Sequence, residues 1–110
     1  MHYMLSWFDL SDGETIEDFR PDYIAFVEQM QKLELVVSTS PLGVRESDTP
    51  MDTDDERSQQ YFSTMTFRDR NQLDAAYAHM MKHPEPEEST HRSMLNRVVN
   101  PRFICWKDID

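Results

Sequence analysis

The segment Gln59–Phe67, QQYFSTMTF, constrains this chain most, because apolar residues fall on both faces of the strand that it predicts. Side chains alternate along a strand, so Tyr61, Met65 and Phe67 share one face while Phe62 lies on the other. A sheet that contains such a strand must be covered on both sides. A chain of 110 residues holds too few helices to cover both faces, so we expect a second copy of the chain to cover one of them.

Three further strands are predicted from β-branched and aromatic residues. The first covers His2–Asp9 and the last covers Arg102–Lys107, and both are again apolar on two faces. Between them, Leu35–Ser38 predicts an edge strand that resumes as Val44–Ser47 after a Pro-Gly interruption. The chain therefore supplies four strands.

Helical periodicity predicts a helix from about Thr15 to Leu33, and Pro21 predicts either a kink or a start near Arg20. A second helix is expected to begin at Asp69 as N-cap and to end at Pro84. Its expected buried stripe consists of Leu73, Ala76, Tyr77, Met80 and Met81. A short extra helix is expected over Ser89–Arg97, with Met94 and Leu95 turned inward and Asn100-Pro101 ending it.

The predicted order βαββαβ is that of a ferredoxin-like domain, an α+β fold with both main helices on one face of a four-stranded antiparallel sheet. We expect a single domain over residues 1–110. In this order of elements the chain resembles the dimeric α+β barrel superfamily. The resemblance covers nearly the whole chain and includes MHYMLSWFDL, YFSTMTF, LDAAYAHM and RFICWKD. The run SDTPMDTDDER, followed by YFSTMTFRDR, also looks like a small group of uncharacterised bacterial proteins of this fold.

The superfamily includes small antibiotic-biosynthesis-type monooxygenases, EthD-like proteins and muconolactone-isomerase-like enzymes. The resemblance implies a homodimer in which two sheets pack face to face, with a pocket between sheet and helices in each protomer. It implies no catalytic residue, because no catalytic set of the superfamily matches this sequence residue by residue.

Net charge, the N-terminal residues and the single cysteine limit the partners and the location that we expect for this protein. The net charge of -10 disfavours nucleic acid and anionic membrane surfaces as partners. The N-terminal residues lack the basic cluster of a signal peptide, and the one cysteine, Cys105, forms no intrachain disulfide. We therefore expect a cytoplasmic protein without a membrane partner, in which Cys105 is a buried, inert thiol.

Two groups of residues raise the question of a metal. Asp52, Asp54 and Asp55 lie in an acidic run whose spacing does not match an EF-hand. A solvated or interface loop is therefore favoured over a calcium or magnesium site, and the arginines that could partly neutralise it are Arg45, Arg57 and Arg68. His79 and His83 are four residues apart, a spacing that suits two metal ligands. Their position near a helix C-terminus explains the pair without a metal. The favoured prediction is no metal and no cofactor.

Aromatic residues predict the nature of a ligand. Trp7, Tyr61, Tyr77 and Trp106 are candidates to line a cavity for a flat apolar molecule, although such stripes also form ordinary cores. The candidates for a general acid or base are His2, Asp9 and His91. The sequence thus predicts a homodimer that binds a small apolar or aromatic molecule, with a cofactor-free oxygenase or isomerase as its enzymatic form. The alternative is a non-catalytic module whose acidic loop serves docking or stabilises the dimer.

Overall fold

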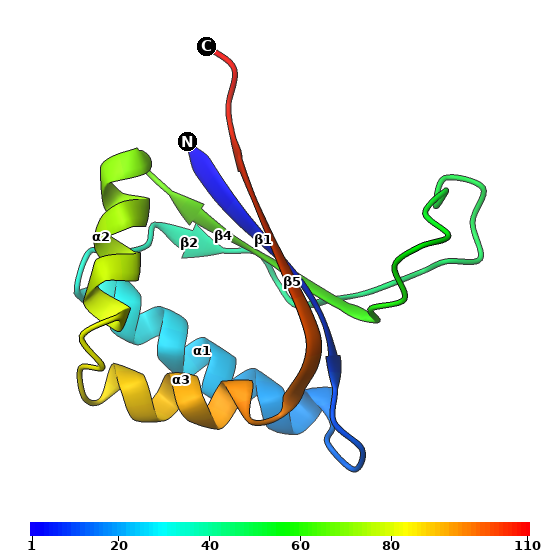
Figure 1. Ribbon diagram of the computed structural model, residues 1–110, viewed down its shortest axis with the longest axis horizontal. Coiled ribbons are helices and arrows are strands. Elements are labelled where there is room, and N and C mark those ends of the chain that lie inside the picture. The colour runs from blue at the N-terminus through cyan, green and yellow to red at the C-terminus, as the bar shows by residue number, and fades with distance from the viewer.

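A computed structural model describes all of residues 1–110 and shows three helices beside one sheet, as Figure 1 illustrates. The strands are β1 (His2–Leu10), β2 (Ser38–Thr39), β3 (Gly43–Val44), β4 (Tyr61–Phe67) and β5 (Val98–Lys107). The helices are α1 (Ile16–Lys32), α2 (Arg70–Met80) and α3 (Glu87–Leu95). Both chain ends lie at the same end of the sheet, where the N-terminal amine and Asp108 pair at 3.3 Å.

The strand order is β2-β4-β1-β5, and β3 pairs with the other end of β4. All pairings are antiparallel. This is the predicted ferredoxin-like α+β fold, with the expected edge strand divided into two short pieces on either side of Pro41. The edge strand also begins later than predicted, since Val36 is buried in the core and precedes β2.

The first helix begins at Ile16, close to the predicted start near Thr15. The Thr15 hydroxyl accepts a hydrogen bond from the Asp18 N–H at 3.2 Å, and the helix continues without a break through Pro21. The expected alternative of a start near Arg20 is therefore wrong. Proline removes only one backbone donor here, and the apolar face on both sides of it holds the helix on the sheet.

The core lies between α1 and the sheet. Phe8 of β1 packs on Phe19 of α1 with ring centroids 4.9 Å apart, and on Tyr61 of β4 at 5.8 Å. Ten buried residues form this cluster: Phe8, Phe19, Tyr23, Phe26, Val27, Met30, Val36, Phe67, Ala76 and Met94. Each large side chain that is buried in this way contributes roughly 1.5–3 kcal/mol.

Four residues that were expected inside are exposed. Tyr77 and Met81 of the predicted stripe, Leu95 and the thiol of Cys105 all reach solvent. The reason is that α2 and α3 do not close over β5, so that side chains on the facing surfaces border an open hollow. The closing strand also begins at Val98, ahead of the predicted helix break, and Asn100 adopts a positive φ within it. No helix is long and apolar enough to cross a membrane.

Candidate functional site

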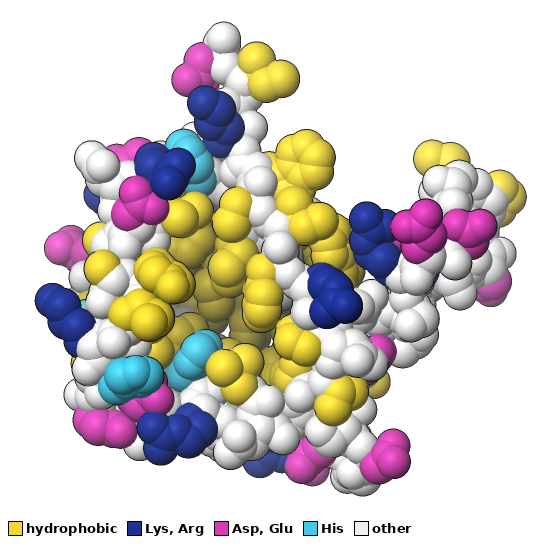
Figure 2. Space-filling view, viewed as in Figure 1, with side chains coloured by type: hydrophobic (Ala, Val, Ile, Leu, Met, Phe, Trp, Pro, Cys, Tyr) yellow, Lys and Arg dark blue, Asp and Glu magenta, His cyan; other side chains and the backbone are white.

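The hollow between the helices and the sheet is a cavity of about 610 Å³. Figure 2 shows it as a recess between the helices and β5 that is lined with hydrophobic side chains. Of its 26 lining residues, 19 are hydrophobic. Its volume lies within the range of about 300–1,000 Å³ that is usual for small-molecule sites.

Methionine is the most frequent residue type in the lining of the cavity. Six of the eight methionines of the chain border the cavity: Met4, Met30, Met65, Met80, Met81 and Met94. Methionine has three flexible torsions and a polarisable sulfur, which adapts to irregular shapes and contacts aromatic rings favourably. The lining is therefore suited to flat apolar ligands of more than one shape.

The floor of the cavity carries two hydroxyl groups. Ser6 of β1 and Ser63 of β4 lie directly opposite one another on neighbouring strands, and both line the cavity. Ser63 is 3% exposed, so its hydroxyl is shielded from bulk water. Neither residue was predicted as a site residue. Each is a small polar residue at an inward position of an otherwise apolar alternation, and that is the signal that the sequence carried.

His91 is the candidate base that reaches the cavity. Its ring lies against Phe26, with centroids 4.9 Å apart, and α3 places it in the wall. Burial lowers the pKa of His91 below its ordinary value, and the charge of nearby Glu88 acts in the opposite direction as the smaller cause. The imidazole is therefore mainly neutral near pH 7 and able to accept a proton.

The other two candidate bases lie elsewhere. His2 faces the helical side of β1 but does not line the cavity, and its Nδ1 is buried without a hydrogen-bond partner. Asp9 uses Oδ1 to accept the Gln60 N–H at 2.9 Å, which fixes the start of β4. Of the three candidates, the structure brings only His91 to the cavity.

The four aromatic candidates do not share one site. Tyr77 borders the large cavity, whereas Trp7, Tyr61 and Trp106 border a second hollow of about 530 Å³. The alternation of β1 explains the position of Trp7, which points to the face opposite to that of Phe8 and the helices, whereas Tyr61 is the register partner of Phe8 at the end of β4. The expectation of one cavity lined by all four is wrong.

The two histidines of α2 and its C-terminal turn have separate acidic partners. His79 Nε2 lies 2.8 Å from the buried carboxylate of Glu87, and His83 Nδ1 lies 3.2 Å from Glu88. Glu88 also pairs with Arg92 at 2.8 Å, and the hydrogen bond from Arg92, followed by that from His83, lowers the pKa of Glu88. These contacts join α2 to α3 across their connecting loop.

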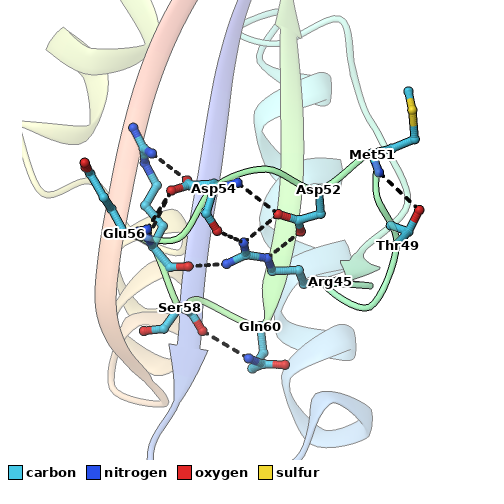
Figure 3. A network of polar contacts seen from close by, with 9 residues as sticks. Arg45, Thr49, Met51, Asp52, Asp54, Glu56, Ser58 and Gln60 are labelled. Carbon is cyan, nitrogen blue, oxygen red and sulfur yellow. Dashed lines mark hydrogen bonds and ion pairs between the residues drawn. The ribbon is translucent and has the colours of Figure 1, made fainter.

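The acidic run forms an arm, residues 45–60, that projects on the side of the sheet away from the helices. Figure 3 shows that its centre is Arg45, whose guanidinium donates to both carboxylate oxygens of Asp52, at 2.8 and 2.9 Å, and to the Asp54 carbonyl at 2.7 Å. Arg57 pairs with the Asp54 carboxylate at 2.5 Å. The expected neutralisation by Arg45 and Arg57 is thus confirmed, while Arg68 pairs with Asp69 outside the arm.

These contacts leave the acidic residues of the arm without a metal-binding arrangement. The hydrogen bond from Arg45 lowers the pKa of Asp52, and backbone N–H groups, led by that of Glu56, lower the pKa of Asp54. Asp55 is exposed beside them. No three His, Cys, Asp or Glu side chains gather as a metal-binding group anywhere in the chain.

Comparison with known proteins identifies the fold of the chain through solved structures and not through its sequence. No protein-family model matches the chain, and no curated protein matches its sequence. Many solved structures have a similar backbone, among them the following three. A crystal structure of an antibiotic biosynthesis monooxygenase is 16% identical, with a TM-score of 0.64 and 100% of both chains covered. A dimeric ferredoxin-like protein of unknown function from Jannaschia sp. CCS1 is 18% identical, with a TM-score of 0.65, 97% of this chain and 98% of that chain covered.

The third is SnoaB, a cofactor-independent oxygenase from Streptomyces nogalater. It is 8% identical, with a TM-score of 0.59, 99% of this chain and 93% of that chain covered. At such identities the likeness concerns the backbone and not the residues of a site. The chain therefore has a ferredoxin-like fold.

Proposed function

We propose that this protein is a homodimer that binds a small, apolar or aromatic molecule in the cavity between its helices and its sheet. The observation that carries the proposal is the cavity itself, about 610 Å³ in volume and lined mostly by hydrophobic side chains. An open hollow of this volume with a mainly apolar lining has the character of a small-molecule site, which supports binding of an apolar ligand.

The proposed dimer forms through the face of the sheet opposite to the helices. This face carries Trp7, Phe62, Ile104 and Trp106, and Trp106 is 60% exposed in the single chain. Exposed apolar surface of this kind on a sheet marks an interaction site. Several solved structures with this fold are dimeric proteins, which supports a second copy as the cover.

In the enzymatic form of the proposal, neutral His91 removes a proton from a carbon of the bound molecule. The resulting carbanion gives electrons to O₂ directly, so a CH₂ group and O₂ become C=O and H₂O without a cofactor. Returning the proton to another carbon would give an isomerase instead. A positioned base of this type contributes about 10²–10⁴-fold to the rate.

The second candidate is a non-catalytic module, and the ordered arm favours it. Arg45 holds the arm in one conformation through four acceptors, and the arm overhangs the hollow beside Trp7 and Trp106. In this proposal the arm docks against the second subunit, and the cavity binds a ligand without catalysing a reaction.

Binding in the cavity is tested with Nile red, an uncharged dye whose fluorescence rises in apolar surroundings. Ala76 is buried in the cavity wall on α2, and Ala78 is exposed on the same helix. We expect the wild-type chain and Ala78→Phe to bind the dye equally and Ala76→Phe to bind it at least fivefold more weakly. Equal binding by the two variants, with unchanged melting temperatures, would overturn the proposal.

Proton transfer separates the enzyme from the module. The probe is 2-tetralone, an uncharged two-ring ketone with an acidic CH₂, and the readout is exchange of that CH₂ with D₂O by proton NMR. The enzyme predicts exchange catalysed by the wild-type chain that falls at least a hundredfold in His91→Gln. Exchange at the rate of buffer alone, with the dye still bound, favours the module.

A further inference from the structure

We propose that Ser6 and Ser63 determine which molecule the cavity accepts: an uncharged apolar compound with a carbonyl or hydroxyl oxygen near the middle of its length. This inference rests on the proposed binding function and names the class of ligand. It follows from the position of the two hydroxyls on the cavity floor and from the charges that the lining lacks.

The floor consists of three successive rows of side chains on the helical face of the sheet. The first row is Met4, Met65 and Cys105, the second is Ser6, Ser63 and Phe103, and the third is represented by Phe8. Two residues separate neighbouring rows, so the floor extends over roughly 13 Å along the strands. The serine pair therefore lies at the middle row, between sulfur-containing residues on one side and the ring of Phe8 on the other.

The hydroxyls are available to a ligand. Ser63 is 3% exposed and lines the cavity, and the backbone groups around it are already used by the pairing of β1 with β4. Buried polar groups normally have a hydrogen-bond partner, and the open side of this pair is the cavity. An oxygen that accepts from both hydroxyls satisfies them at once.

The lining also excludes a class of ligand. It contains no lysine and no arginine, while Asp74 and Glu88 contribute carboxylates. Its two histidines are His91 and His83, the second of which contacts Glu88. An anionic head group would lose its hydration without meeting a positive charge, which is costly in an apolar site. Fatty acids, phosphate esters and other anions are therefore disfavoured, and an uncharged compound is favoured.

The test compares fluorene with 9-fluorenone by equilibrium dialysis. The two have the same three-ring shape, and fluorenone adds one carbonyl at the middle. We expect the wild-type chain to bind fluorenone at least fivefold more tightly, because two hydrogen bonds are gained. The variant Ser6→Ala/Ser63→Ala should bind both compounds equally, and Ser58→Ala, a change on the exposed arm, should keep the preference.

Further results distinguish the role of the serine pair from the binding function of the cavity. Equal binding of both probes by the wild-type chain overturns the role of the serines but leaves a cavity that binds. Failure of both probes where Nile red still binds also overturns it, and failure of all three overturns the binding function itself. Binding of 9-fluorenone-2-carboxylate as tightly as fluorenone would contradict the requirement for an uncharged ligand; we expect it to bind at least tenfold more weakly.

Discussion

The side chain of Gln72 should contribute more to stability than any other polar side chain of α2, and the cavity depends on it. Its Oε1 accepts the Arg68 N–H at 2.7 Å, and its Nε2 donates to the Glu34 carbonyl at 2.9 Å. Gln72 is 5% exposed. It thus joins the start of α2 to the turn after α1, where Glu34 has a positive φ. This contact fixes the helix that supplies one cavity wall.

The cost of Gln72→Ala follows from these contacts. Two hydrogen bonds are lost, each worth about 0.5–1.5 kcal/mol when water can replace the missing partner. Arg68 and Glu34 are exposed residues, so water can reach the freed backbone groups and this range applies to both bonds. We expect a loss of roughly 1–3 kcal/mol, which lowers the melting temperature by roughly 4–13 °C in a chain of this length.

Thermal unfolding at one fixed protein concentration measures this effect. Gln72→Met separates the hydrogen bonds from packing, because it keeps most of the side-chain volume and should lose nearly as much stability as Gln72→Ala. Asn71→Ala, on the exposed side of the same turn, is the control and should change stability by less than about 0.5 kcal/mol. The reasoning is refuted if Gln72→Ala melts with the control, or if Gln72→Met melts with the wild-type chain.

Three other predictions concern the arm, His91 and the dimer. Arg45→Ala should release the arm, so trypsin should cut after Arg57 many times faster than in the wild-type chain; an unchanged rate would contradict the role of Arg45. Because the pKa of His91 is lower in the folded chain than its ordinary 6.5, its contribution to stability is complete above pH 6.5 and falls as the pH drops below that value. His91→Phe should therefore lose less stability than the wild-type chain between about pH 6.5 and 5, and identical pH profiles would refute this. In light scattering, the wild-type chain should have twice the chain mass, and Leu5→Asp, on the face of the sheet that is turned away from the helices, should be a monomer. The control Ile24→Asp, at an exposed position on α1, should remain a dimer, and a monomeric wild-type chain would exclude the dimer.

Much of the fold could be predicted because it depends on local patterns. Alternation in β4 and β1 assigns each side chain to a face, and the register of the sheet agrees with the predicted assignment of Tyr61, Phe62 and Trp7. The caps at Thr15 and Asp69 begin both main helices where expected, since each side chain accepts a backbone N–H three residues later.

The resemblance implied a pocket between sheet and helices, but its size and most of its lining could not be predicted, because periodicity gives the direction of a side chain and not the distance between a helix and a sheet. Leu95 and Cys105 were therefore expected to be buried, and they are exposed around a cavity. The serine pair was missed for a related reason. Ser6 and Ser63 are 57 residues apart in the sequence, and only the register of two strands places them opposite one another.

The order of the arm was also only partly visible in the sequence. Charge composition predicted neutralisation by arginines, but the bidentate contact of Arg45 with Asp52 requires the chain to turn back on itself within seven residues. Such a turn depends on the side-chain contacts that form in the folded arm, since the intervening segment has no regular helix or strand.

The methyl resonances of methionine test the central claim most directly, because the cavity divides the eight methionines into two groups. Six line it, whereas Met1 and Met51 lie outside and are 50% and 89% exposed. In a titration of ¹³C-methyl-labelled protein with 9-fluorenone, the resonances of the six should shift together with one dissociation constant, while those of Met1 and Met51 stay in place. Unmoved resonances for the six, or equal shifts for all eight, would contradict a binding cavity between the helices and the sheet.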